Sequence, residues 1–341
     1  MVVIKPLHLV SNLEKYKLVM RIVVMGCGSI GCRHLHNLHN LGYNNLLAFD
    51  PTEAARRYVE RELEVISLAT VDEVWMQHPE VVLITAPTNL HTELARAAIQ
   101  HQCHLFIEKP LSHSLESLAE LWAEIKERGL ISMVACNMRF HPGPAKVKQL
   151  IEGGAVGQVI ASRIQTGSYL PRWRPQQDYR QSYSASTEWG GAILDCIHEI
   201  DLALWYFGPA RVLAAAKLSA SAIDLETDGL AEIILRHEAG VLSNIHLNFV
   251  QRDYRRTCQV IGSEGTVYWD FNERRVQVYG PAGELVQTWP EPEEWLVNQM
   301  YLDELDHFLQ AVQTGTPTVN PVGNGLATLQ VALAARQMEL G

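Results

Sequence analysis

Three side chains in the sequence have the chemistry to move protons: Lys109, Asp195 and His198. Asp195 and His198 are three residues apart, and residues at this spacing share one face of a helix, as do His198 and Asp201. A carboxylate beside an imidazole can orient the ring and tune its pKa, which a general acid or base requires. A single histidine on an apolar helix is more often a core residue, and no convincing third ligand makes this trio a metal site, so we expect no metal.

A glycine-rich segment, Gly26-Cys27-Gly28-Ser29-Ile30-Gly31, follows the apolar run Ile22–Met25 and precedes a stretch of helical character. In a strand, turn and helix of this kind, the first glycine permits the tight turn and the second lets the backbone approach a pyrophosphate. The third lets the helix pack on the strand. The pyrophosphate would rest on the N-terminus of the helix, where Ser29 and Ile30 lie. The segment therefore predicts a dinucleotide-binding turn.

An acidic residue, Asp50, ends the next apolar run and lies 19 residues after Gly31. Its carboxylate can accept hydrogen bonds from the adenosine ribose hydroxyls and would repel a 2′-phosphate. Arg56 and Arg57 follow, and an arginine near this position can tolerate NADP, although two such arginines more often form a solvated helix face. We therefore expect NAD as the cofactor, with NADP less favoured.

Lys109 follows the apolar run Leu105–Ile107, in the sequence Glu108-Lys109-Pro110. The carboxyl ends of strands face the ligand crevice of an open α/β sheet, so Lys109 is expected to point at the nicotinamide. Partial burial and the cationic nicotinamide ring would both lower the pKa of this lysine and suit it to proton transfer. A lysine at the end of a strand is otherwise usually a surface charge.

The elements that must position these groups alternate between short apolar runs and helical stretches from Met20 to about Asn137. This alternation predicts a doubly wound parallel α/β domain. The expected strands are Ile22–Met25, Leu46–Phe49, Val81–Thr85, Leu105–Ile107 and Ile131–Ala135. The expected helices are Ile30–Leu41, Glu53–Leu63, Thr92–His101 and Leu115–Arg128.

After Gly153-Gly154 strand-like segments follow one another without helices between them, which predicts a largely antiparallel open sheet. One helix, from about Ala192 to Phe207, interrupts the strands, and two more close the chain. The fold class is therefore an N-terminal Rossmann domain with a C-terminal α+β domain. We expect residues 1–19 to be a dispensable extension, residues 20–140 to bind NAD, and residues 141–341 to form the substrate and oligomerisation domain, with its last helices packing back on the first domain.

Composition narrows the class of protein. The chain has 341 residues and a formal net charge of −10, and it lacks the basic face that nucleic-acid binding needs. No apolar run approaches the roughly 18 residues of a membrane helix. The six cysteines contain no Cys-x-x-Cys pair, so we expect free thiols and a cytoplasmic location.

A segment rich in aromatic, arginine and hydroxyl side chains precedes the Asp195 region and includes Arg172, Trp173 and Tyr179. Such side chains can stack on a sugar ring and clamp a carboxylate or phosphate. An ordered loop whose aromatic residues cap a helical face is an equally good interpretation.

Taken together, the motifs resemble the Gfo/Idh/MocA oxidoreductase family, named for glucose–fructose oxidoreductase, inositol dehydrogenase and a rhizopine-catabolism protein. The resemblance covers nearly the whole chain from Met20 onward. The motifs that carry it are Gly26–Gly31, Ala86–His91, Glu108–Pro110, Asn137–Phe140, Gly190–Asp201, Gly262–Thr266, Tyr301–Leu305 and His307-Phe308.

The resemblance implies an NAD-dependent oxidoreductase that transfers hydride to or from a hydroxyl carbon of a sugar, inositol, sugar acid or nucleotide-linked sugar. Lys109 would contact the substrate hydroxyl and the cofactor, and His198 would be the acid/base, with Asp195 beside it on the substrate. Glu108 would help Lys109 to hold its ammonium between ribose and substrate. The residues that would line the dinucleotide are Pro87, Asn89, His91, Glu108 and Asn137.

One departure from the family pattern concerns the acid/base pair. The usual spacing is Asp-x-x-x-His, whereas Asp195-Cys196-Ile197-His198 is one residue shorter. Spacings of three and four place a neighbour on opposite sides of the reference residue. The role of His198 is therefore better supported than that of Asp195, and the division of acid/base work stays open.

Two further functions are compatible with the same motifs. Some family members use transient oxidation by NAD to eliminate a glycosidic leaving group, and these are hydrolases without net NADH production. Others are non-catalytic sensors, which tend to lose the lysine and histidine that are present here. The family usually buries the open face of its C-terminal sheet between subunits, so we also expect a homodimer or homotetramer.

Overall fold

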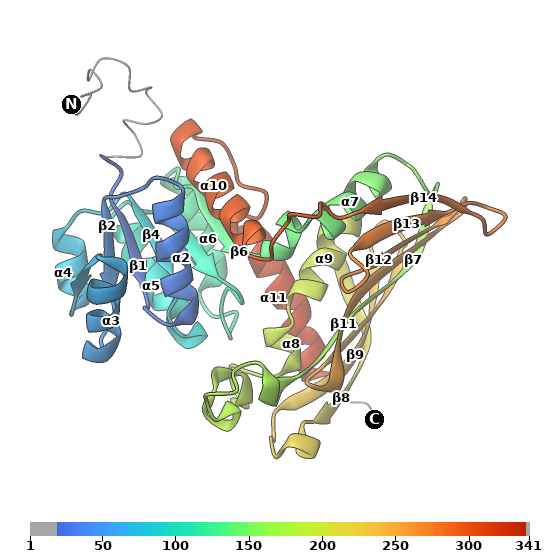
Figure 1. The fold of residues 1–341 in the computed structure, drawn as a ribbon, viewed down its shortest axis with the longest axis horizontal. Coiled ribbons are helices and arrows are strands. Elements are labelled where there is room, and N and C mark those ends of the chain that lie inside the picture. The colour runs from blue at the N-terminus through green and yellow to red at the C-terminus, as the bar shows by residue number, and fades with distance from the viewer. Residues whose placement is uncertain (1–18, 339–341) are drawn as a thin grey trace. The chain divides into compact units, whose positions relative to one another are not determined.

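The computed structural model describes residues 19–338, which divide into two compact units (Figure 1). The first unit contains residues 19–108, 120–133 and 301–321, and the second contains residues 109–119, 134–300 and 322–338. The domain boundaries expected after residues 19 and 140 stay predictions. The expected extension, except for Val19, lies outside the described residues.

The first unit is built on a six-stranded parallel sheet with the strand order β3-β2-β1-β4-β5-β6. This is the order of a doubly wound dinucleotide-binding fold, so the predicted Rossmann architecture is confirmed. The strands are β1 (Ile22–Met25), β2 (Leu46–Phe49), β3 (Ile66–Leu68), β4 (Val81–Ile84), β5 (His104–Glu108) and β6 (Ser132–Ala135). The helices are α2 (Ser29–Asn40), α3 (Glu53–Leu63), α4 (Val71–Met76), α5 (His91–Gln100), α6 (Leu118–Glu127) and α10 (Gln299–Thr314).

Both faces of this sheet are covered, which explains why strands such as β1 and β4 are apolar at every position rather than at every second one. Every residue of β1 and β4 is buried, as expected for parallel strands covered on both sides. Helix α10 contributes to this core, because the Phe308 ring packs 5.5 Å from the ring of Phe106 in β5. The strands thus bring the Gly26 turn and Glu108 to their carboxyl ends within one rigid core.

The second unit is built on an eight-stranded sheet with the order β14-β13-β12-β11-β7-β10-β9-β8. All neighbouring pairs are antiparallel except β7 and β10, which are parallel, so the predicted largely antiparallel sheet is confirmed. The strands are β7 (Val159–Tyr169), β8 (Ala210–Ser219), β9 (Asp228–His237), β10 (Leu242–Asn248), β11 (Val250–Gly262), β12 (Thr266–Asp270), β13 (Arg275–Tyr279) and β14 (Leu285–Pro290). The helices are α7 (Pro142–Glu152), α8 (Ala192–Asp195), α9 (His198–Phe207) and α11 (Val322–Gln337).

Helices α7, α8, α9 and α11 cover one face of the eight-stranded sheet (Figure 1). The covered face carries buried apolar side chains such as Val260 and Val267, whereas Gln259 and Thr266, which precede them, are polar. At Gly143 in α7 only glycine fits, because a Cβ there would lie 1.9 Å from Nε1 of the buried Trp269. The helices that carry the candidate acid/base residues are therefore packed on an amphipathic sheet.

The single helix expected from Ala192 to Phe207 is in fact two helices. Helix α8 ends at Asp195, and Cys196, with φ −91° and ψ 33°, separates it from α9, which begins at His198. Asp195 and His198 therefore do not share a face of one continuous helix. The expectation of a shared face is wrong, because the chain turns between them.

All six cysteines are free thiols, and five of them are buried. Burial raises the pKa of Cys103 and Cys258 to about 12, so both remain uncharged. Among residues 19–338, no helix combines the length and the apolar character that a membrane crossing requires.

Candidate active site and dinucleotide-binding turn

Two of the three glycines in the turn after β1, Gly26 and Gly31, leave no room for a side chain, whereas Gly28 does. Gly26 has a φ of +111°, and a Cβ there would lie 2.6 Å from the backbone nitrogen of Ala86. A Cβ at Gly31 would lie 1.9 Å from the carbonyl oxygen of Gly26, so this glycine lets helix α2 approach the strand. At Gly28, by contrast, a Cβ would meet nothing within 4 Å. The space beside Gly28 is therefore open to a ligand.

The N-terminus of α2 fits a pyrophosphate. Gly28 is its N-cap and provides no side-chain cap, and the first turn, which begins with Ser29 and Ile30, contains no acidic residue. The first N–H groups of a helix and its dipole attract a negative group, and no carboxylate competes for them here. The residues of the turn thus fit the diphosphate of NAD.

Asp50 lies directly after β2 and is bound to the glycine-rich turn. Its Oδ2 accepts a hydrogen bond from the Cys27 N–H at 2.8 Å, and its Oδ1 accepts one from the Thr52 N–H at 2.8 Å. Arg56 donates to the backbone carbonyl of Asp50 at 2.7 Å, and Arg57 pairs with Glu53. A carboxylate fixed beside the turn suits ribose hydroxyls and disfavours a 2′-phosphate, so the site fits NAD.

The residues after β4 and β6 that are predicted to line the dinucleotide differ in their exposure to solvent. Pro87 and Asn89 are exposed in the short connection that leads into α5. The ring of His91 is buried, with its Nε2 2.8 Å from the carbonyl oxygen of Ala86. In the second unit, Asn137 is buried after β6. These four residues stay predictions as cofactor contacts.

Glu108 ends β5 and is held by a histidine of the phosphate-binding helix. The Oε1 atom of Glu108 lies 2.7 Å from Nε2 of His34, whose side chain is fully buried in α2. The His34 ring also packs against Phe106, with centroids 5.2 Å apart. This pair links the helix of the glycine-rich turn to the end of β5, a connection that sequence reasoning did not predict.

Lys109 is bound to Asp195 at the end of α8. Its Nζ donates to the backbone carbonyl of Asp195 at 2.8 Å and to the Asp195 Oδ1 at 3.0 Å. The two side chains are 18% and 2% exposed, so this ion pair is largely shielded from water. The structure thus brings together two of the three predicted catalytic residues.

Two hydroxyl groups complete the surroundings of Asp195. The Tyr183 hydroxyl donates to Oδ1, and the Ser184 hydroxyl donates to Oδ2 at 2.6 Å. Both residues come from a 3₁₀ turn, Tyr183–Ala185, in the aromatic segment before α8. The sequence showed that hydroxyls are present in this segment, but no spacing rule connects them to Asp195.

The charges of this cluster stabilise one another. Burial acts to raise the pKa of Asp195, but the Lys109 ammonium and the hydroxyl donors outweigh it and lower that pKa. Burial acts to lower the pKa of Lys109, but the negative charge of Asp195 and its hydrogen bond raise it well above its ordinary value. The lowered pKa expected for Lys109 is therefore wrong for the protein's own groups, because a carboxylate lies 3.0 Å from the ammonium.

His198 begins α9 and is buried. Burial, together with the positive charges of Lys109 and Arg256, lowers its pKa well below the ordinary value, so the ring is neutral at pH 7. Within the described part of the chain, its Nδ1 has no hydrogen-bond partner. The carboxylates of Asp195 and Asp201 bind Lys109 and Arg139, and their expected role in orienting the His198 ring stays a prediction.

Two buried ion pairs hold helix α9. Arg139 forms two parallel hydrogen bonds with Asp201, at 2.8 and 2.7 Å. Arg256 pairs with the fully buried Glu199, with Nε 2.7 Å from Oε1. These partners come from other parts of the second unit, so periodicity along α9 could not reveal them.

The predicted substrate residues of the aromatic segment lie in its exposed part. The Trp173 indole N–H donates to Ser168 at 2.9 Å, and the Tyr179 hydroxyl donates to the carbonyl of Ile223 at 3.0 Å. The Arg172 guanidinium lies 5.9 Å from the ring centroid of Tyr169. Trp173 and Tyr179 thus have structural bonds of their own, and their contact with substrate stays a prediction.

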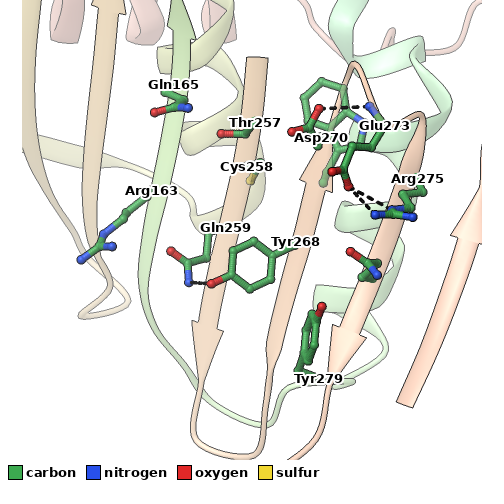
Figure 2. A pocket seen from close by; sticks show the side chains of 12 residues that line it. Arg163, Gln165, Thr257, Cys258, Gln259, Tyr268, Asp270, Glu273, Arg275 and Tyr279 are labelled. Atoms are coloured by element: carbon green, nitrogen blue, oxygen red, sulfur yellow. Dashed lines mark hydrogen bonds and ion pairs between the residues drawn. The ribbon is translucent and has the colours of Figure 1, made fainter. Parts of the chain in front are cut away.

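A separate hollow of about 360 Å³ lies on the eight-stranded sheet (Figure 2). Polar side chains of β7, β11, β12 and β13 line it, among them Gln259, which hydrogen-bonds the Tyr268 hydroxyl. None of the predicted catalytic or cofactor-binding residues contributes to its lining. The hollow is therefore distinct from the Lys109 site.

Comparisons with known proteins match both halves of the chain. Residues 20–136 match the model of an oxidoreductase family with an NAD-binding Rossmann fold, and residues 145–268 match the model of the GFO/IDH/MocA C-terminal domain. The two matches agree with the parallel sheet of the first unit and the antiparallel sheet of the second.

Similar proteins include several named dehydrogenases. The myo-inositol 2-dehydrogenase of Thermotoga maritima is 28% identical over 332 residues, which cover 93% of this chain and 96% of that protein. The uncharacterized oxidoreductase YrbE of Bacillus subtilis is 27% identical over 326 residues, with 92% of each chain covered. A solved levoglucosan dehydrogenase in complex with NADH has the same fold, with a TM-score of 0.83 and 19% identity over 93% of this chain and 96% of that one. The chain belongs to the Gfo/Idh/MocA family of NAD-binding oxidoreductases.

Proposed function

We propose that this protein is a dehydrogenase that transfers hydride between NAD and a hydroxyl-bearing carbon of a sugar, inositol, sugar acid or nucleotide-linked sugar. The observation that carries the proposal is the Lys109 ammonium, which Asp195 fixes in a shielded position at 3.0 Å. The names of its relatives, which include inositol and levoglucosan dehydrogenases, support a polyhydroxylated substrate.

The glycine-rich turn and Asp50 would hold the cofactor. The pyrophosphate would lie on the N-terminus of α2 beside Gly28, and Asp50 would accept hydrogen bonds from the ribose hydroxyls. Further along the chain, the dinucleotide would be lined by Pro87, Asn89, His91, Glu108 and Asn137. Bound NAD supplies the hydride acceptor, and the protein supplies orientation and charge.

Lys109 and His198 would divide the acid/base work. Because its pKa is raised, Lys109 stays protonated and can donate a hydrogen bond to the reacting oxygen, which stabilises negative charge there. His198 is neutral, so it can accept the hydroxyl proton, and its Nδ1 has no partner in residues 19–338. In the reductive direction the same groups return the proton to the oxygen.

The aromatic segment would form the substrate side. Trp173 and Tyr179 offer flat surfaces for a sugar ring, and Arg172 offers a guanidinium for a carboxylate or phosphate. Asp195 would contact the substrate beside Lys109.

A spectrophotometric screen tests the function. Purified protein is incubated with NAD or NADP and with sugars, inositols, sugar acids and nucleotide sugars, and absorbance at 340 nm is followed. NADH formation with one substrate class supports the dehydrogenase. Cleavage of glycosides without net NADH would replace it with a hydrolase, and NAD binding without any turnover favours a sensor.

The homodimer or homotetramer expected from the family is also part of the proposal, as is a cytoplasmic location. The polar outer face of the eight-stranded sheet, with the hollow at Tyr268, is the surface that a second subunit would cover. Sedimentation velocity of the wild type and of Tyr268→Asp tests this assembly, since a charged side chain within a subunit interface should favour the monomer.

A further inference from the structure

The carboxylate of Asp195 is occupied on both of its oxygens. Oδ1 accepts from the Lys109 ammonium at 3.0 Å and from the Tyr183 hydroxyl, and Oδ2 accepts from the Ser184 hydroxyl at 2.6 Å. The side chain is 2% exposed, so water contributes little to its solvation. A carboxylate with three donors, one of them charged, is strongly stabilised as the anion and is a weak proton acceptor.

Tyr183 can act only as a donor in this arrangement. Burial, the negative charge of Asp195 and their hydrogen bond raise the pKa of Tyr183 well above its ordinary value against the opposing effect of Lys109, so the phenol remains protonated. Cys196 is also uncharged, because burial raises its pKa well above the ordinary value, and His198 is neutral, because burial with Lys109 and Arg256 lowers its pKa. Glu199, whose pKa burial raises, is paired with Arg256. Lys109 and Asp195 therefore form a pair of opposite charges, with the neutral hydroxyl groups of Tyr183 and Ser184 beside the carboxylate.

Backbone hydrogen bonds fix the segment that contains Tyr183 and Ser184. The N–H of Gly191 donates to the carbonyl of Ser184 at 3.0 Å, and the N–H of Gly190 donates to the carbonyl of Ser186 at 3.1 Å. A Cβ at Gly190 would lie 2.2 Å from the carbonyl oxygen of Tyr183, so the backbone at Gly190 is in close contact with the backbone at Tyr183. The hydroxyls are thus placed by a fixed turn rather than by a mobile side chain.

We propose that Tyr183 and Ser184 are positioning residues, which hold Asp195 as a fixed anion that orients Lys109 and does not itself exchange a proton with the substrate. The inference rests on the proposed dehydrogenase function and assigns to two residues of the aromatic segment a role in aligning the lysine. It leaves proton exchange to His198, with Lys109 as the hydrogen-bond donor to the reacting oxygen.

Two matched pairs of variants test the proposal. Tyr183→Phe removes the hydroxyl on Oδ1, and its control is Tyr206→Phe, which removes a buried tyrosine hydroxyl that donates to the carbonyl of Pro144. Ser184→Ala removes the hydroxyl on Oδ2, and its control is Ser182→Ala in the same segment, whose hydroxyl donates to the carbonyl of Tyr179. Each variant is made in the full chain, and its steady-state kinetics are measured from pH 5 to pH 10 with the substrate found in the screen.

We expect Tyr183→Phe and Ser184→Ala each to lower kcat about tenfold, which is the effect of one hydrogen bond to a charged group. KM for NAD should stay close to that of the wild type, because neither hydroxyl belongs to the dinucleotide turn. The hydroxyls lower the pKa of Asp195, so their loss should raise it, and kcat of the two variants should decline more steeply than kcat of the wild type as the pH is lowered to 5. The two controls should keep the wild-type kcat and its dependence on pH.

A crystal structure of the double variant Tyr183→Phe/Ser184→Ala provides a readout that needs no substrate. We expect the Asp195 carboxylate to turn away from the Lys109 ammonium. The proposal is overturned if the carboxylate keeps its place and both single variants keep the wild-type kcat, or if the controls lose as much activity. Should Tyr183→Phe fail to fold, the Ser184 and Ser182 pair decides alone. A wild type without dehydrogenase activity would reject the proposed function, and the crystal structure would still test the positioning.

Discussion

The ammonium of Lys109 donates two hydrogen bonds to one residue, Asp195, at 2.8 Å to its backbone carbonyl and at 3.0 Å to its carboxylate. The carbonyl bond depends on the course of the chain at the end of α8, and the carboxylate bond depends on the side chain. The position of the lysine is therefore set jointly by a helix terminus and by a charge.

Replacement of Lys109 by alanine tests its catalytic role. We expect turnover to fall by about 10²- to 10⁴-fold, the usual contribution of a positioned acid or base, whereas NAD binding is largely kept. The measurements are kcat at saturating substrate and NAD affinity by calorimetry. Lys148→Ala is the matched control, since Lys148 donates to the carbonyl of Trp205 on α9 and should leave turnover unchanged. Unchanged turnover in Lys109→Ala would remove this residue from the mechanism.

Substitution by alanine should affect stability differently at Gly28 and at Gly31 of the glycine-rich turn. Gly28→Ala places a methyl group in open space, so the melting temperature should be close to that of the wild type and only NAD affinity should fall, by about tenfold. Gly31→Ala places a Cβ 1.9 Å from the carbonyl of Gly26, so it should lower the melting temperature as well. Thermal unfolding without cofactor and calorimetric titration with NAD separate the two effects. Equal losses of stability in both variants would contradict this account of the turn.

Removal of one member of the Arg139–Asp201 ion pair should destabilise the protein more than removal of both members. Arg139→Met leaves the carboxylate of Asp201 buried with its charge uncompensated, and we expect it to lower the free energy of unfolding by about 3–5 kcal/mol. The double variant Arg139→Met/Asp201→Leu removes both charges and should recover most of that loss. Urea unfolding monitored by circular dichroism measures both. A double variant as unstable as the single one would show that the pair is needed for more than charge compensation.

His141 should make the protein acid-sensitive. Burial, with the positive charges of Arg256 and Arg274, lowers its pKa to about 3, and its Nδ1 accepts a hydrogen bond from the Gly143 N–H at 3.1 Å. Below about pH 6.5 the unfolded chain takes up a proton on this residue and the folded protein does not, so stability falls as the pH drops from about 6.5 to about 3. The loss should amount to a few kcal/mol.

His141→Asn provides the comparison for this pH dependence. Asparagine can still accept the Gly143 N–H at the start of α7 but cannot be protonated in this range. Urea unfolding of both proteins between pH 7 and pH 4 should show a shallower decline in the variant. Parallel declines would mean that other groups cause the acid sensitivity.

The sequence predicted the parallel sheet well because its central strands, β1 and β4, are apolar throughout and buried on both faces. The expected strands Ile22–Met25 and Leu46–Phe49 agree with the observed bounds. Strand β3 was not predicted, since it has only three residues, and Ile66 at its start is exposed. A strand this short has no hydrophobic pattern that distinguishes it from a loop.

The candidate site was predictable only where the backbone itself requires a residue type. The glycine-rich turn could be identified because helix and strand approach too closely for a Cβ at Gly31. The bonds between Lys109 and Asp195 join residues 86 positions apart, and no local pattern encodes them. The break at Cys196 was also hidden, because Ala192–His198 contains neither glycine nor proline.

The parallel pairing of β7 with β10 has a consequence for how such proteins diversify. Parallel neighbours require a crossover, and here the connection between β7 and β10 also contains β8 and β9. Its part before β8, residues 170–209, carries the aromatic segment, helices α8 and α9, and the residues Tyr183, Asp195 and His198. The sheet on either side is joined by backbone hydrogen bonds that do not depend on side-chain identity. New substrate preferences can therefore evolve by exchange within one continuous insert, while the ladder of strands that supports it is inherited unchanged.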